Sequence, residues 1–476
     1  MTRGGRRRPP PSAFRLTDAA HRELLRRRAL LAGCAPRAGY DPSVPRHHIT
    51  ELPSGLRIAS ERLPGVRSVA VGFWIGTGSR DETPRKAGIS HFIEHLLFKG
   101  TRSYDALEIA EIFDALGGEL NAATSREHTV VYARVPDEQL ETAVRVMAEM
   151  VFVPRFAELE TEREVVLEEI AMVEDDPQDL VHDSFGEAVF GGHPLGVPVI
   201  GTAEVISSVS RRTIQAHHRA AYAPANVVVS AAGNVRHDAF RDLVERTFPA
   251  LVDGPAATIR RAPLTSTPAP TLRFQRKDTE QYHVCVGATG ISRTDDRRFA
   301  MSLFDAILGG SASSRLFQEI REKRGMAYSV FSFVSQYQES GQLGIYVGTR
   351  GENVGSCLEI VAEQVGELAA GRITPGELQR AKDNVKGRIL LALESTSSRM
   401  SRLGKSLVTG VELVSAEKVI RSLEQVQADE LAAIATELLA PCRLSAAGIG
   451  PDEDVFLAGI DRINPALRGG RVRALA

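Results

Sequence analysis

The 476-residue sequence predicts an α+β protein built from two tandem homologous domains. Segments typical of strands and of helices occur in both halves, and the second half repeats their order. A stretch rich in proline, alanine and threonine, Asp253–Pro270, separates the halves and is typical of a linker. We therefore expect a basic arm over 1–45, a first domain over 46–245, a linker over 246–270 and a second domain over 271–476.

Composition narrows the class of protein. The formal net charge of −2 gives no reason to expect a nucleic acid or a membrane as partner. Four scattered cysteines without a Cys-X-X-Cys pair are typical of reduced thiols in a cytoplasmic protein. No apolar stretch approaches the roughly 20 residues of a transmembrane helix. The sequence thus predicts a soluble cytoplasmic protein.

The first 45 residues differ from the rest, because they contain ten arginines and begin with an extended Pro9–Pro11 run. We expect disorder here, apart from a short helix over Thr17–Leu31. Leu31–Cys34 resembles a lipoprotein cleavage box, but its apolar run is shorter than the roughly 7–15 residues of an export signal. An arginine-rich transit peptide is an alternative use of this arm.

Apolar periodicity and turn residues define the elements of the first half. The predicted strands are Gly55–Ser60, Val69–Ile75, the hairpin Glu119–Thr124 with Thr129–Val135, and Asn226–Ala232. The predicted helices are Gly88–Lys99, Ala106–Leu116, Glu138–Met150, Phe156–Glu174 and Ser210–Tyr222.

The helix over Gly88–Lys99 contains the pattern His-X-X-Glu-His. His91 and His95 lie one turn apart on the same face, so two imidazoles can bind one metal ion, and Glu94 projects beside them. This order is the inverted form of the zinc-protease motif, in which the glutamate acts on water. The alternative is a buried helix whose histidines are satisfied by hydrogen bonds, so a third ligand decides between the two interpretations.

The helix predicted over Phe156–Glu174 supplies a candidate for that ligand. Its apolar stripe also contains Glu162 and Glu169, whereas Glu168 falls on the opposite side. Carboxylates are seldom buried unless they are paired or bind a cation. We therefore predict Glu169 as the third metal ligand and Glu162 as a residue that orients a histidine or the substrate site. A charged surface helix is the alternative.

The second half repeats this outline without metal ligands. Its predicted elements are Val284–Ala288, Arg297–Leu308, Arg315–Lys323, Tyr328–Gln336, Gly341–Gly348, Val354–Ala370 and Thr374–Leu393. When Leu159 is aligned with Leu378, Glu162 and Glu169 fall on Ala381 and Arg388. No histidine follows His283, so we expect a duplication in which only the first copy holds a metal ion.

Taken together, these motifs resemble the pitrilysin (M16) family of inverted-motif zinc proteases, in particular the mitochondrial processing peptidase and its bacterial relatives. The segments that carry the resemblance are His91–His95, Phe98–Thr101, Gly117–Ala122, Glu162–Glu169 and Gly192–Gly196. The likeness covers about residues 46–460. It implies two α/β sandwiches, each an antiparallel-rich sheet covered by helices, that form half of a clamshell.

The resemblance also implies a mechanism. One Zn²⁺ per chain would be held by His91, His95 and Glu169, with Glu94 as the general base of a zinc metalloendopeptidase. The substrate would be an unstructured peptide or a presequence-like segment, extended along the Gly118–Thr124 strand edge. Asn121 and Ala122 are the residues of that strand expected to bind it.

The resemblance further implies that Arg321 and Tyr328 bind the substrate carbonyl from the facing half of the clamshell. Because one chain has only two of the four repeats that a clamshell needs, we expect a homodimer, or a heterodimer with a related chain, in which these residues act across the interface. An ordinary surface arginine and a core tyrosine are the alternative. The alternative function is a non-catalytic or partner-dependent subunit of such a heterodimer.

Overall fold

The computed structural model describes residues 47–247, 263–264 and 266–470. The expected arm over 1–45 and most of the predicted linker lie outside the described residues, and the domain boundaries stay predictions. None of the helices in the described part of the chain is long and apolar enough to cross a membrane.

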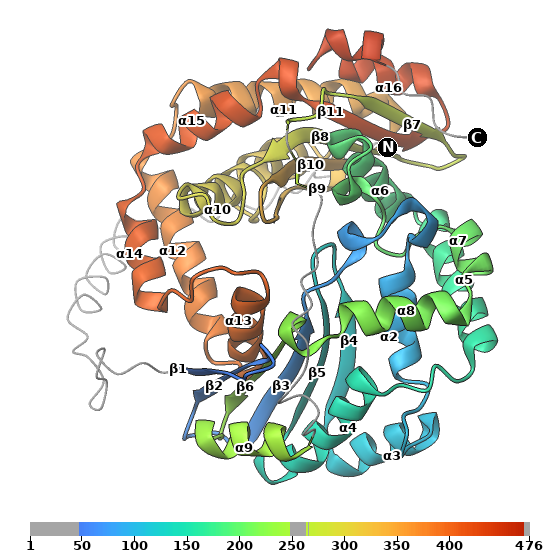
Figure 1. Ribbon diagram of the computed structural model, residues 1–476. Coiled ribbons are helices and arrows are strands. Elements are labelled where there is room, and N and C mark those ends of the chain that lie inside the picture. Colours follow the sequence, from blue (N-terminus) through green and yellow to red (C-terminus); the bar gives the residue numbers. More distant parts are fainter. Residues whose placement is uncertain (1–46, 248–262, 265, 471–476) are drawn as a thin grey trace, which may run out of the picture. The chain divides into compact units, whose positions relative to one another are not determined.

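The first sheet has six strands in the order β1-β2-β6-β3-β5-β4 (Figure 1). The strands are β1 (His47–Glu51), β2 (Arg57–Arg62), β3 (Ser68–Ile75), β4 (Glu119–Thr124), β5 (Thr129–Pro136) and β6 (Val227–Gly233). Only β2 and β6 pair in parallel, and the other neighbours are antiparallel. The central strands β3 and β6 are buried almost throughout, so both faces of the sheet are covered.

The second sheet has the order β7-β11-β8-β10-β9. Its strands are β7 (Leu272–Arg276), β8 (Tyr282–Gly290), β9 (Ala327–Gln336), β10 (Gly341–Thr349) and β11 (Ser445–Gly450). If β1 is set aside, β2-β6-β3-β5-β4 in the first sheet corresponds strand for strand to β7-β11-β8-β10-β9 in the second. In each sheet the first strand along the chain pairs in parallel with the fifth, β2 with β6 and β7 with β11. The α+β class and the tandem repeat predicted from the sequence are therefore confirmed.

The helices follow the same plan in both halves. The first half contains α2 (Ile89–Leu97), α3 (Ala106–Leu116), α4 (Leu140–Phe152), α5 (Leu159–Asp175), α6 (Pro177–Phe190), α7 (Ala203–Ser208), α8 (Arg211–Ala221) and α9 (His237–Thr247). The second contains α10 (Arg298–Leu308), the π-helix η7 (Phe317–Glu322), α11 (Val354–Ala369), α12 (Pro375–Ala392), α13 (Thr396–Val408), α14 (Ala416–Gln425), α15 (Ala428–Leu438) and α16 (Glu453–Ile460). The sequence interpretation missed β1, β7, β11, α6, α7, α9 and α13–α16.

Each sheet is covered on one face by a helix that belongs to the other half. Helix α6 of the first half lies against β8 and β11 of the second sheet, where Val181, Phe185 and Val189 pack with Tyr346 and Ile449. Each buried side chain of this size contributes about 1.5–3 kcal/mol through the hydrophobic effect. This contact therefore joins the two halves through an apolar core.

Helix α13 of the second half makes the reciprocal contact with β3 and β6 of the first sheet (Figure 1). Met400 packs there with Ala70 and Trp74. Gly404 approaches Trp74 so closely that a Cβ atom would lie 1.9 Å from the indole Nε1. A glycine is thus required at this point of the helix.

Candidate metal centre

The start of α2 is fixed by two close contacts. Gly88, the residue before the helix, has φ of 88°, and a Cβ there would lie 2.4 Å from the carbonyl oxygen of Ile200. The Glu82 carboxylate accepts hydrogen bonds from the backbone N–H groups of Gly88 (2.7 Å) and Ser90 (2.8 Å). Burial raises the pKa of Glu82 to about 7 in spite of these bonds. The first turn of α2, which carries His91, is therefore anchored at the backbone.

The structure brings His91, His95 and Glu169 together. Glu169 Oε2 lies 3.7 Å from His91 Nε2 and 3.3 Å from His95 Nε2, and one ligand atom from each residue lies within 4.8 Å of the others. Two ligand atoms about 2.1 Å from a tetrahedral zinc ion are roughly 3.4 Å apart. Two imidazoles and one carboxylate at this spacing therefore fit zinc, and three protein ligands leave a coordination position open.

Glu162 orients His95. Its Oε1 lies 2.9 Å from His95 Nδ1, and its Oε2 lies 2.7 Å from Lys99 Nζ. Because a carboxylate only accepts hydrogen bonds, Nδ1 carries the proton and Nε2 presents a lone pair toward Glu169. Glu162 is only 4% exposed, and these two partners explain how a carboxylate is tolerated there.

His91 has the protonation state that a metal ligand needs. Burial, and then the neighbouring His95, lower the pKa of His91 to about 4, so the imidazole is neutral at pH 7. Its Nδ1 is buried and has no hydrogen-bond partner in the described part of the chain.

Glu94 lies between the metal candidates and the edge of the first sheet. Its Oε2 accepts a hydrogen bond of 2.5 Å from the hydroxyl of Thr124, the last residue of β4. Burial raises the pKa of Glu94, and the Thr124 bond opposes this shift. The carboxylate is therefore held in place and is a better proton acceptor than a solvated one.

Asn121 and Ala122 lie on β4, which ends the sheet in the described chain and pairs only with β5. The Asn121 side chain is exposed, and its Oδ1 accepts a hydrogen bond of 2.8 Å from the backbone N–H of Ala122. A peptide that pairs with this N–H would have to displace the Asn121 side chain.

Arg321 and Tyr328 lie together on the second half. The Arg321 guanidinium carbon is 4.7 Å from the ring centroid of Tyr328, and Tyr328 is 77% exposed on β9, the edge strand of the second sheet. The alternative of a core tyrosine is therefore wrong. Within the described chain, no hydrogen bond or ion pair joins either side chain to the His91, His95 and Glu169 group.

Sequence reasoning missed three residues that support this centre, namely Glu82, Lys99 and Thr124. Glu82 sits in a loop with no periodicity, and its role depends on the chain folding back onto the start of α2. Lys99 and Glu162 are far apart in sequence. Thr124 offered a usable signal, because a polar residue at the end of the predicted edge strand lies next to the predicted metal helix.

Comparisons with known proteins agree with this geometry. The family model described as Insulinase (Peptidase family M16) matches residues 57–203, and that described as Peptidase M16 inactive domain matches residues 208–385. A protein of Mycobacterium leprae (strain TN) named as an uncharacterized zinc protease is 43% identical over 406 residues, which cover 84% of this chain and 91% of that protein. A protein of Bacillus subtilis (strain 168) with the same description is 42% identical over 387 residues, covering 81% and 94%.

Solved structures show the same architecture. A protease from Helicobacter pylori has a TM-score of 0.81 at 25% identity and covers 86% of this chain and all of its own. A peptidase M16 inactive domain from Pseudomonas fluorescens has a TM-score of 0.78 at 22% identity, covers 85% of this chain and 98% of its own, and speaks for the fold alone. With both family models and relatives of this similarity, the chain belongs to peptidase family M16, a family of zinc proteases.

Proposed function

We propose that this chain is a zinc-dependent metalloendopeptidase that hydrolyses unstructured peptides or presequence-like segments inside a dimeric chamber. The observation that carries the proposal is the Glu169 carboxylate beside both imidazoles, 3.7 Å from His91 and 3.3 Å from His95. His91, His95 and Glu169 would hold one Zn²⁺ per chain. When bound, zinc supplies a Lewis acid and an activated water at neutral pH.

Glu94 is the general base in this proposal. Its carboxylate would accept a proton from the attacking water and pass it to the leaving amine. The hydrogen bond from Thr124 keeps the carboxylate at the sheet edge, where the peptide would lie. Glu162 fixes the His95 tautomer and would keep Nε2 available throughout the reaction.

The substrate would extend along β4, with Asn121 and Ala122 among its contacts and main-chain hydrogen bonds as the main source of affinity. Arg321 and Tyr328 of a second copy would donate hydrogen bonds to the oxygen that becomes negative during attack. The exposure of Tyr328, which stacks with the half-buried Arg321, supports this role, because another chain can reach the pair. A homodimer is the simplest assembly that supplies them.

The test compares zinc content and cleavage of an unstructured peptide in four proteins: the parent, Glu94→Gln, His95→Ala and Glu164→Gln. Glu164 is exposed on α5 and serves as the control. We expect Glu94→Gln to keep zinc but lose cleavage, His95→Ala to lose both, and Glu164→Gln to match the parent. If Glu94→Gln cleaves as well as the parent, the assignment of the base is wrong.

A partner-dependent subunit is the second candidate. Within the described chain, no hydrogen bond or ion pair joins Arg321 or Tyr328 to the metal candidates, as expected if a partner chain completes the site. Light scattering with a cleavage assay separates the two candidates: an active homodimer supports the first, whereas a zinc-loaded but inactive chain supports the second. A cytoplasmic location belongs to the same proposal, since the three described cysteines form no disulfide.

A further inference from the structure

A cavity of about 730 Å³ shares Thr124 with the candidate metal centre. Its walls come from the β4–β5 turn, the end of β9 and helix α13, and its volume lies in the range of small-ligand sites, about 300–1,000 Å³. The lining is strongly cationic. The charged side chains are Arg126, Arg293, Arg298, Arg402, Lys405 and a single carboxylate, Glu127.

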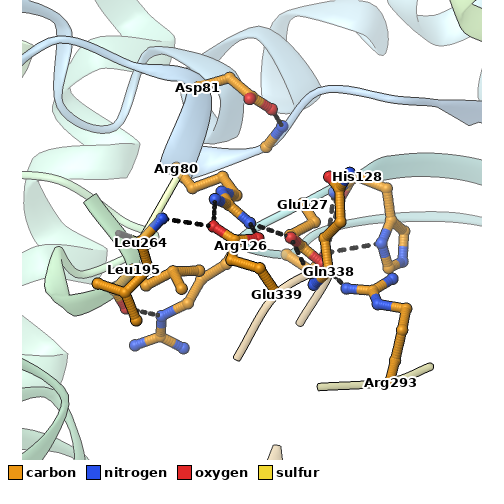
Figure 2. Close-up of polar contacts among 12 residues, drawn as sticks. Arg80, Asp81, Arg126, Glu127, His128, Leu195, Leu264, Arg293, Gln338 and Glu339 are labelled. Atoms are coloured by element: carbon orange, nitrogen blue, oxygen red, sulfur yellow. Dashed lines mark hydrogen bonds and ion pairs between the residues drawn. The ribbon is translucent and has the colours of Figure 1, made fainter. Parts of the chain in front are cut away.

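The Glu127 carboxylate is already engaged in ion pairs. Glu127 forms ion pairs with the guanidinium groups of both Arg80 and Arg293 (Figure 2). Arg80 also donates a hydrogen bond of 3.0 Å to Glu339. The Glu127 carboxylate therefore balances charge within the wall of the cavity, and Glu127 adds no negative charge near the cations of α13.

The cations that α13 contributes are short of counter-ions. Arg402 lies 3.2 Å from Glu61, but Arg399 pairs with the same carboxylate. Lys405 is exposed and lines the cavity, and it has no ion pair in the described part of the chain. Although the residue as a whole is exposed, partial desolvation by the cavity walls, and then the charge of Arg293, lower the pKa of Lys405. A bound anion would oppose this shift, because a nearby negative charge favours the charged form of the lysine.

The lining also has an excess of hydrogen-bond donors. Buried N–H groups of Arg293, Arg402 and Gln336 have no acceptor within the described residues. The N–H dipoles of these groups make the electrostatic potential in the cavity more positive, although the nitrogen atoms themselves are shielded from solvent. A cavity of this kind favours a carboxylate over a cation or a neutral group.

We propose that this cavity binds a carboxylate of the peptide substrate, with Lys405 as its main partner and the neighbouring guanidinium groups adding positive potential. The inference rests on the proposed function and adds a substrate class to it. A peptide that extends along β4 and continues past Thr124 would enter the cavity, so the carboxylate would lie at a fixed number of residues from the cleaved bond. This carboxylate can belong to an acidic side chain or to the C-terminus of the peptide, because both present the same anionic group to Lys405.

The test uses pairs of unstructured peptides that differ at one position, Glu against Gln, scanned along the sequence, together with a free acid against an amide at the C-terminus. We expect the parent to cleave the acidic member of one pair about tenfold better in kcat/KM, the effect of one charge-assisted hydrogen bond. In Lys405→Gln this ratio should fall toward one, and Lys405→Arg should restore most of it. Lys418→Gln, which removes an exposed lysine on α14 outside the cavity, should keep the parental ratio.

Because each ratio compares two peptides on one protein, a partly unfolded variant does not imitate the result. Equal kcat/KM for every pair in the parent would overturn the proposal, as would an unchanged ratio in Lys405→Gln. If the parent cleaves no peptide, the proposed function fails, and the cavity is then judged by anisotropy with labelled peptides bound to zinc-loaded Glu94→Gln. Tighter binding of the acidic member would support the cavity site, and equal binding would overturn it.

Discussion

Helices α5 and α12 occupy equivalent places in the two repeats, but at two aligned positions α5 has a glutamate and α12 has an uncharged or a basic residue. In α5, Glu162 is buried and bonds to His95 and Lys99, whereas the aligned Ala381 of α12 is buried in the apolar core of the second half. Glu169 faces the imidazoles, and its counterpart Arg388 is exposed. The fold is complete in the second repeat without these acids, which supports the proposal that Glu162 and Glu169 serve a metal centre rather than the scaffold.

A second pair of contacts shows what both repeats retain. Glu94 of α2 accepts a hydrogen bond from Thr124 of β4, and Asp305 of α10 accepts one of 2.6 Å from Ser332 of β9. In both repeats a carboxylate thus ties a helix to the edge strand. Within the described residues, only the first repeat places two histidines beside this carboxylate, and we propose the zinc site there.

The largest effect is expected when the residues at the equivalent positions of α5 and α12, Glu169 and Arg388, are exchanged. Glu169→Arg should lose stoichiometric zinc and reduce peptide cleavage by at least about 10³-fold, since an unloaded site has no activated water. Arg388→Glu, the reciprocal change on an exposed position, should leave both unchanged. Zinc analysis and a cleavage assay measure this, with circular dichroism to verify folding. Zinc retention in Glu169→Arg would contradict the ligand assignment.

The second repeat is expected to contribute through Tyr328. Tyr328→Phe should lower kcat by about 10²-fold, the cost of one donor to an oxyanion, without changing zinc content. If the residue acts across a dimer, mixing Tyr328→Phe with Glu94→Gln should recover part of the activity, because one of the two sites in a mixed dimer is intact. No recovery on mixing, with subunit exchange verified, would place the residue outside the reaction.

Glu162→Ala gives α5 the residue that α12 carries. We expect zinc affinity to fall about 10–100-fold, because His95 loses the partner that fixes its tautomer and Lys99 loses its counter-ion. Competition with a chelating dye measures the change. Glu164→Ala, on an exposed position of the same helix, is the control, and an equal loss in both variants would point to a helix effect instead.

The reciprocal helix contacts can be tested at Gly404. Gly404→Ala should lower the free energy of unfolding by about 1–3 kcal/mol, since the new methyl group meets the Trp74 indole. Gly387→Ala in α12 is the matched control: nothing lies within 4 Å of its Cβ position, so it should stabilise by about 0.5–1 kcal/mol. Denaturant titrations compare the two.

The smallest expected effect concerns pH. Burial lowers the pKa of His218 to about 4, and its Nε2 lies 2.8 Å from the carbonyl of Val151. Between pH 6.5 and 4 the unfolded chain binds a proton that the folded chain does not, so stability is full above pH 6.5 and falls as pH decreases. From pH 6.5 to 5.5 this group should cost about 1 kcal/mol.

His218→Gln should lack this part of the pH dependence in denaturant titrations. In the parent, hydrogen exchange should increase in α8 before it increases in the equivalent α15, which has no histidine. Equal acid sensitivity of the two helices would contradict the assignment.

The sequence could predict the elements that depend on local pattern. Helix α3 has the predicted ends because Asp105 caps it and Gly117 terminates it with φ of 61°. The position of Glu169 beside the histidines followed from carboxylates on an apolar stripe. Contacts set by chain folding could not be predicted: Glu82 at the start of α2, and the cationic cavity, whose walls come from both halves.

The missed elements have physical reasons as well. Strand β11 is Ser-Ala-Ala-Gly-Ile-Gly, whose small residues fit a crowded sheet interior but give little strand signal. Helix α6 buries Val181 and Phe185 against the second sheet, and periodicity indicates that a face is buried without indicating the partner. In α13, Gly404 lowers the intrinsic helix propensity, and its close approach to Trp74 of the first half is not visible in the local pattern.

The exchange of α6 and α13 between the halves also constrains synthesis of the protein. The last described element of the first half ends at residue 247, but the helix that covers β3 and β6 begins at residue 396. At about 5–20 residues per second, a ribosome needs roughly 7–30 s to make the intervening chain. During that interval α13 does not yet cover Trp74 and its apolar neighbours, so the nascent first half has an apolar surface that can aggregate.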